Sequence, residues 1–294
     1  MNAIHPAPRE ALAQHDNPLA LQGIEFVEYA TARPQTLGQS LEKLGFQPVA
    51  RHRSREVLLY RQGDMNIIVN AHRDPDEPAL PDTAELTAVA LRVRDAGKAY
   101  RRVLELGAWG LPTKVEVMEL NIPAIHGVGN SRLYFVDRCG DFSIYDVDFI
   151  PIPGVDTRPD AAGGLRFFGL VQYIGPERMG DWIAFYSELF GFRELPADHH
   201  FGVLSRGCIL ASPCGRLHWQ LVEPAADAWL DVAGDEYLER LAFACADVQA
   251  TVAQLVRRGV DFARPAVAPE DASLGALTTP SDSGPTFELV RDPR

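Results

Sequence analysis

The strand-like segment RLHWQLVE carries the residues whose types and spacing best suit chemistry. Side chains alternate between the two faces of a strand, so His218, Gln220 and Val222 share one face. An imidazole can ligate a metal ion or transfer a proton near neutral pH. The alternative is that His218 is a hydrogen-bonded strand residue beside Trp219, and both interpretations stay open.

Other reactive residues form weaker patterns. His199 and His200 are adjacent in a loop-like stretch, which is more typical of a surface than of a metal site. Asp146 and Asp148 are interpreted as structural. The cysteines include no CxxC pair, so we expect reduced thiols rather than a zinc site, with Cys208 and Cys214 buried. The cysteines are Cys139, Cys208, Cys214 and Cys245.

Composition excludes several functional classes. The chain has 294 residues, 46% of them hydrophobic, and a net charge of -12. Binding to nucleic acid needs clustered Lys and Arg, which this acidic chain lacks. No apolar run approaches the roughly 20 residues that span a membrane. The N-terminus also lacks the pattern of a secretion signal. We therefore expect a cytoplasmic protein that contacts neither nucleic acid nor membrane.

One pattern of elements recurs four times along the chain. A strand-like run precedes an amphipathic helix, and the helix ends at a glycine suited to a left-handed closing residue. The four predicted helices are TLGQSLEKLGF, AGKAYRRVLELGA, MGDWIAFYSELFGF and VQATVAQLVRRGV, closed by Gly45, Gly107, Gly191 and Gly259.

Further strands follow each helix as predicted hairpins. Their turns are expected at Gly63–Asp64, at Cys139–Gly140, within the segment from Gly202 to Glu223, and near Ser283–Gly284. Four such units predict an α+β fold of four βαβββ modules, paired into two half-barrel domains. The expected division is a mobile arm (1–20), an N-terminal domain (21–152), a linker (153–164) and a C-terminal domain (165–294).

The sequence resembles the 4-hydroxyphenylpyruvate dioxygenase family of the vicinal oxygen chelate superfamily. The resemblance rests on GIEFVEYA, VLLYRQGDMNIIVN, MELNIPAIHGVGNSRLYFVDR, MGDWIAFYSELFGFRE and GPTFELV, and it covers nearly the whole chain. It implies Fe(II) held by two His and one Glu, with open positions for a 2-oxo acid and dioxygen. It also implies a homodimer or homotetramer, and a C-terminal lid helix, which we expect to be missing here.

Only one of the three implied iron ligands is present. The first His position falls on Gly169, the second on Arg240, and the Glu is retained as Glu288. Glycine has no donor, and a permanently protonated guanidinium has no lone pair for a cation. No cofactor is therefore expected, with Fe(II) only if the loss is compensated. A site rebuilt from His218, Gln220 and Glu288 is one such compensation, while Gln172 has the wrong strand parity.

Arg240 and Glu288 would lie within a few ångströms of each other if both occupy the implied ligand positions. The pair would be either a structural salt bridge or an anchor for an acidic ligand. The resemblance also places Gln220 and Val222, together with Ser205 and Arg240, among the candidate ligand-binding residues.

Three functions remain open. The first is a metal-free relative that binds a small aromatic or 2-oxo-acid-like molecule. The second is a metal-independent isomerase or lyase whose catalytic residues are His218, Arg240 and Glu288. The third is an active 4-hydroxyphenylpyruvate dioxygenase that forms homogentisate with atypical metal ligands.

Overall fold

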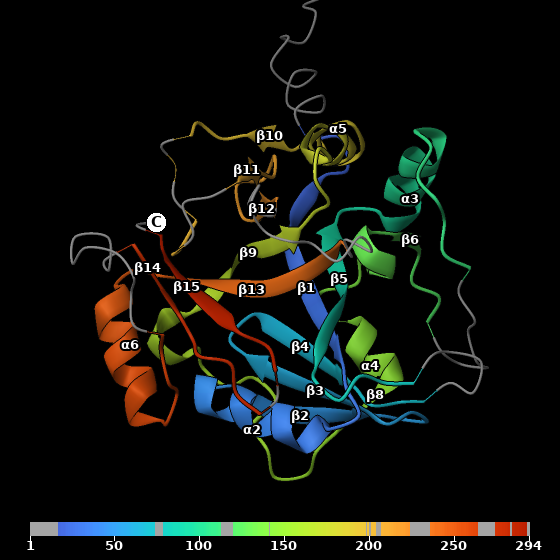
Figure 1. The fold of residues 1–294 in the computed structure, drawn as a ribbon. Coiled ribbons are helices and arrows are strands. Elements are labelled where there is room, and N and C mark those ends of the chain that lie inside the picture. The colour runs from blue at the N-terminus through green and yellow to red at the C-terminus, as the bar shows by residue number, and fades with distance from the viewer. Residues whose placement is uncertain are drawn as a thin grey trace, which may run out of the picture.

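The chain forms two mixed β-sheets with helices packed around them (Figure 1). The computed structural model describes residues 17–73, 79–112, 120–140, 142–197, 199, 201–203, 207–223, 236–263, 274–282 and 284–292.

The N-terminal sheet has the strand order β6-β7-β5-β1-β4-β3-β2-β8. Its central strand β1 pairs in parallel with β4 and antiparallel with β5. The strands are β1 (Leu21–Ala30), β2 (Gln47–His52), β3 (Val57–Gln62), β4 (Met65–Asn70), β5 (Glu85–Val93), β6 (Ala124–His126), β7 (Arg132–Val136) and β8 (Phe149–Pro151), and the helices are α2 (Pro34–Leu44), α3 (Ala96–Glu105) and α4 (Ile144–Asp148).

The C-terminal sheet repeats this arrangement with the order β10-β11-β12-β9-β13-β15-β14. Strand β9 pairs in parallel with β12 and antiparallel with β13, as β1 does with β4 and β5. The strands are β9 (Arg166–Tyr173), β10 (Arg193–Glu194), β11 (Cys208–Ala211), β12 (His218–Val222), β13 (Tyr237–Cys245), β14 (Gly275–Leu277) and β15 (Phe287–Arg291), and the helices are α5 (Met179–Phe190) and α6 (Val248–Arg257). The predicted α+β class with two repeated sheets is confirmed.

All four predicted helices form, for identifiable local reasons. Gly45 and Gly191 close α2 and α5 with left-handed φ values of 109° and 75°, a conformation that side chains rarely adopt. Asp95 and Asp247 cap α3 and α6, each accepting a backbone N–H through its carboxylate, at 2.8 and 2.9 Å. Such caps satisfy donors that the first helical turn otherwise leaves unpaired.

One predicted hairpin is wrong and the others are confirmed. The segment expected to turn at Cys139–Gly140 instead continues from β7 into α4, and β8 then pairs with β2. A capping box starts this helix, because Ser143 and Asp146 bond each other's backbone and side chain. The strand pairs β3–β4, β11–β12 and β14–β15 are antiparallel, as predicted.

Residues at the end of the predicted arm and in the predicted linker make specific hydrogen bonds. Residues 1–16 of the arm lie outside the described part of the chain, but Asn17 exchanges hydrogen bonds with Leu21 and Leu19 is buried. Residues 153–164 lie between β8 and β9 in the sequence. Within them, Pro159 accepts a backbone hydrogen bond from Gly63 at 2.8 Å, which ties this segment to the β3–β4 turn.

A large apolar core joins the two halves, and each sheet carries a smaller cluster on its other face. Aromatic pairs cross between the halves: Phe46 packs on Phe243 at 5.8 Å and Phe135 on Phe190 at 6.3 Å. Each buried aromatic side chain contributes about 1.5–3 kcal/mol by leaving water. The halves are therefore held together by a continuous hydrophobic core.

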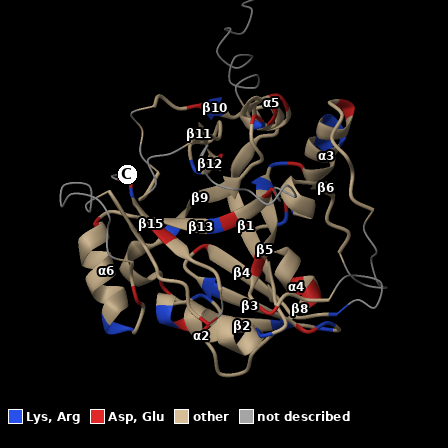
Figure 2. Ribbon diagram, viewed as in Figure 1, with Lys and Arg blue, Asp and Glu red and all other residues tan. Residues whose placement is uncertain are grey.

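The charged residues are distributed over both sheets (Figure 2). Figure 2 shows acidic and basic segments interspersed over both sheets and the helices. The four cysteines are unpaired. None of the helices in the described part of the chain is long and apolar enough to cross a bilayer.

Replacing Phe243 by Ala should lower the free energy of unfolding by about 3–5 kcal/mol. Phe243 is fully buried and its ring contacts Phe46, Phe167 and Phe287. Urea unfolding followed by circular dichroism measures the loss. Phe142→Ala is the matched control, because this ring is 60% exposed. Equal stability of the two variants would contradict a shared core.

Candidate functional site

The candidate residues lie on one face of the C-terminal sheet. We call it the site face, defined by Val171, Val222, Ala242, Ala244 and Val290. The residues that alternate with them, such as Leu170, Leu241 and Leu289, belong to the shared core. This alternation is the ordinary pleat of β-strands, and it explains why Gln172 faces away. Gln172 accepts hydrogen bonds from Tyr186 and Trp219 instead.

Two neighbouring rows of residues cross the site face. His218, Gly169, Ala242 and Glu288 are successive cross-strand partners on β12, β9, β13 and β15. The adjacent row runs from Gln220 through Val171 to Arg240. Arg240 is therefore diagonal to Glu288, within reach of a long side chain.

The structure brings Arg240 and Glu288 together as a buried ion pair. Arg240 Nε donates to Glu288 Oε2 at 2.9 Å, and the two side chains are 4% and 0% exposed. Burial by itself lowers the pKa of Arg240, but the Glu288 carboxylate outweighs this, and the pKa is raised above its usual value. The guanidinium therefore stays charged, as the sequence predicts for this pair.

The guanidinium keeps unused hydrogen-bonding capacity. Its Nη1 lies 3.8 Å from Glu239 Oε1, Tyr173 also contributes to the raised pKa of the guanidinium, and Nη2 is buried without a hydrogen-bond partner among the described residues. An unsatisfied buried donor on a cation costs several kcal/mol, because burial removes the hydration that the group has in water. Such a group favours an incoming carboxylate.

Gly169 leaves no room for a side chain. A Cβ atom at this position would overlap the carbonyl oxygen of His218 and would lie 3.1 Å from Cε2 of Phe201. The obstructing carbonyl belongs to the backbone of β12, which is fixed by pairing with both β9 and β11. An imidazole therefore cannot extend from residue 169 unless β12 moves.

The residues at these positions do not fit an Fe(II) facial triad. Gly169 has no donor and Arg240 is a cation, so Glu288 alone remains of the three implied ligands. Both carboxylate oxygens of Glu288 already accept hydrogen bonds, one from Arg240 and one from the backbone N–H of Val203. Within the described ranges, no group of three His, Cys, Asp or Glu residues is placed to hold a metal.

The other predicted site residues are more scattered. His218 stands three strands from Glu288, roughly 14 Å along a sheet, and its ring stacks on Phe168 at 4.3 Å. Gln220 and Val222 are buried on the site face, as predicted. Ser205 and His200 lie outside the described residues. His199 belongs to no metal-binding group among the described residues. It lies in a turn, where its backbone N–H donates a hydrogen bond to the carbonyl oxygen of Pro196.

Two residue types interpreted as structural behave as such. Burial, and then the nearby Glu194, raise the pKa of the half-buried Cys208 thiol to about 12, so it is a poor nucleophile near neutral pH. Asp146 caps α4, and the backbone N–H of Ser143 lowers its pKa.

Sequence reasoning missed the segment Phe201–Val203. The Phe201 ring is fully buried on the site face and packs edge-on against Phe168 at 5.1 Å. Val203 donates its N–H to Glu288 Oε1 at 2.6 Å. Gly202 stands between Phe201 and Val203 in the sequence, but no spacing rule connects this segment with Glu288, which lies 85 residues after Val203.

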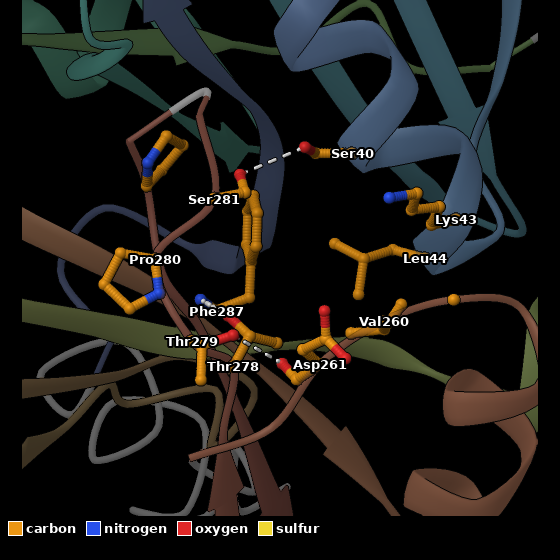
Figure 3. A pocket seen from close by; sticks show the side chains of 12 residues that line it. Ser40, Lys43, Leu44, Val260, Asp261, Thr278, Thr279, Pro280, Ser281 and Phe287 are labelled. Carbon is orange, nitrogen blue, oxygen red and sulfur yellow. Dashed lines mark hydrogen bonds between the residues drawn. The ribbon is translucent and has the colours of Figure 1, made fainter.

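The described cavities lie away from the ion pair. A cavity of about 90 Å³ separates α2 from the β14–β15 connection, with Lys43, Asp261 and Phe287 in its wall (Figure 3). Phe287 and Glu288 point to opposite faces of β15, so this cavity is behind the site face. A second cavity of about 900 Å³ is lined by Glu28, Glu236 and Glu239 where the halves meet, but not by Arg240.

The N-terminal sheet also holds a buried ion pair. Arg92 Nε lies 2.7 Å from Glu25 Oε2, and Tyr145 donates its hydroxyl to Glu25 Oε1 at 3.1 Å. Since these side chains satisfy one another, they need no ligand. We interpret this pair as structural.

Gly169→Ala should lower the free energy of unfolding by about 1–3 kcal/mol or more, because β12 must move to admit a methyl group. Chemical unfolding measures this cost. Gly180→Ala on α5 is the matched control, since a Cβ there meets nothing within 4 Å. The control should be neutral or up to about 1 kcal/mol more stable. A Gly169→Ala protein as stable as the control would show that β12 leaves room for a side chain at residue 169.

Comparison with known proteins agrees with this architecture. The family model described as hydroxyphenylpyruvate dioxygenase, HPPD, N-terminal matches residues 15–150. The 4-hydroxyphenylpyruvate dioxygenase of Pseudomonas sp. (strain P.J. 874) is 44% identical over 186 residues, covering 62% of this chain and 52% of that protein. The enzyme of the same name from Pseudomonas aeruginosa is 33% identical over 279 residues, covering 89% and 75%.

A solved structure shares both halves of the fold. A xylose isomerase-like TIM barrel/4-hydroxyphenylpyruvate dioxygenase fusion protein superposes with a TM-score of 0.69 at 27% identity, covering 94% of this chain and 50% of that one. The chain thus spans about half the length of this protein and of the first Pseudomonas relative. With the extended match to the Pseudomonas aeruginosa enzyme, these similarities establish that the chain belongs to the 4-hydroxyphenylpyruvate dioxygenase family.

Proposed function

We propose that the site face binds a small aromatic or 2-oxo-acid-like molecule through Arg240 and does not carry out iron-dependent oxidation. The observation that carries this proposal is the buried Nη2 of Arg240, which has no hydrogen-bond partner in the part of the chain that the structure describes. A carboxylate at this nitrogen would form a charge-assisted hydrogen bond in a region of low dielectric, where such bonds are strong.

The Arg240–Glu288 ion pair supports ligand binding without iron-dependent oxidation. Glu288 would have to release Arg240 and Val203 before it could hold a metal ion. Arg240 would then be an uncompensated buried cation beside a second cation, an arrangement that Coulomb repulsion opposes. For this reason, the dioxygenase activity in the names of the relatives is not assigned to this chain.

The isomerase or lyase alternative has less support. It requires His218 to act with Glu288 and Arg240, but β9 and β13 lie between the strands of His218 and Glu288, and β9 lies between those of His218 and Arg240. His218 is also stacked on Phe168, which fixes its ring plane parallel to an apolar neighbour. Arg240 alone could still stabilise an anionic form of a bound 2-oxo acid.

Arg240→Met should weaken the binding of 4-hydroxyphenylpyruvate about 10- to 100-fold, because a charge-assisted hydrogen bond is lost. Isothermal titration calorimetry measures the dissociation constant. Arg101→Met on the exposed face of α3 is the control and should bind as the wild type does. Since Arg240→Met leaves Glu288 unpaired, the double variant Arg240→Met, Glu288→Gln provides a version without a buried charge. Unchanged affinity in both would exclude Arg240 as the anchor.

Purified protein reconstituted anaerobically with Fe(II) and then exposed to air should show no oxygen uptake with 4-hydroxyphenylpyruvate. Metal analysis after desalting should find no stoichiometric iron, since two of the implied donors are missing. A bacterial 4-hydroxyphenylpyruvate dioxygenase treated identically is the positive control. One equivalent of iron with oxygen consumption and homogentisate formation would establish the dioxygenase alternative.

A further inference from the structure

The Phe201 ring fills the part of the site face that lies over Gly169. It is fully buried, it contacts Phe168 edge-on at 5.1 Å, and its Cε2 would stand 3.1 Å from a Cβ on residue 169. Phe168 in turn stacks on His218. An aromatic side chain of the protein thus occupies an aromatic-lined position beside the ion pair.

Gly202 and Val203 fasten this ring through Glu288. Val203 N–H bonds one carboxylate oxygen, while Arg240 holds the other. Gly202 passes so close to Glu288 that a Cβ would overlap Oε1, and its φ of +61° is left-handed. Gly275 on β14 makes room for the same turn, because its Cβ would meet Gly202 at 2.6 Å. Gly202 and Gly275, from separate segments, therefore together allow the backbone at residue 202 to approach Glu288 closely.

Phe201 forms an isolated β-bridge outside the strands of the sheet, and the segment is also held by apolar contacts and the Val203–Glu288 hydrogen bond. Displacing it would free the position over Gly169 while Arg240 keeps Glu288 paired. The vacated space adjoins Phe168 on one side and the Arg240–Glu288 row on the other. Its chemistry suits a flat ring joined to a carboxylate by a short link.

We propose that Phe201 is an internal occupant of the aromatic subsite, which a flat aromatic acid must displace to reach Nη2 of Arg240. The inference rests on the proposed binding function and adds to it a preference for aromatic acids. The protein binds an aromatic acid only when Phe201 is out, so its apparent affinity for such an acid falls by the fraction of molecules in that state. An acid without a ring does not take the place of Phe201 and gains little from its removal.

The test compares variants by isothermal titration with 4-hydroxyphenylpyruvate and with pyruvate, which lacks the ring. Phe201→Ala should bind 4-hydroxyphenylpyruvate at least about tenfold more tightly than the wild type, with little change for pyruvate. Gly202→Ala, which expels the segment without removing its ring, should change affinity in the same direction. Phe167→Ala is the control, because Phe167 stacks on Phe243 on the opposite face.

The outcomes separate the two proposals. Tighter binding by Phe201→Ala or Gly202→Ala, but not by Phe167→Ala, supports the internal occupant, and either variant suffices if the other does not fold. Equal affinity of wild type, Phe201→Ala and Gly202→Ala overturns the occupant and leaves the binding function intact. Absence of binding in the wild type and in every variant overturns both.

Discussion

A carboxylate with no exposure to water needs a cation beside it, and this requirement organises the C-terminal half of the molecule. Glu288 meets it through Arg240, at 2.9 Å, on the neighbouring strand. Removing one partner of such a pair costs about 3–5 kcal/mol, because the other charge stays buried and uncompensated. The same carboxylate anchors Val203, and through it the Phe201 ring. One ion pair thus determines both the electrostatics and the packing of the site face.

Much of this was predictable from the sequence because it depends on local or family-wide patterns. The glycines that close α2 and α5 have the required left-handed backbone, and the period-two alternation correctly separates Gln172 from Gly169. The resemblance placed Arg240 and Glu288 near each other, and the strand register explains why: both flank Ala242, one along β13 and the other across on β15. The roles given to Gln220 and Val222 remain predictions.

The remainder depends on contacts between distant segments. Ser143 and Asp146 form a capping box that starts α4 where a hairpin was predicted. This local signal was overlooked because the segment also shows the hydrophobic alternation of strands. Closure of the strand at Gly169 involves the carbonyl of His218, and the identity of either residue says nothing about that distance. The same is true of Phe201, which reaches the site face from outside the sheet. The residues at the implied ligand positions could be read from the sequence, whereas the packing of Phe201 over Gly169 could not.

Anomalous diffraction at the iron absorption edge, from crystals grown after anaerobic incubation with Fe(II), tests directly whether the guanidinium has taken the place of the metal. The ion-pair account predicts no anomalous peak beside Glu288 and continuous electron density between Arg240 and the carboxylate. A peak bound by Glu288 and two further protein donors, with Arg240 swung away, would contradict it.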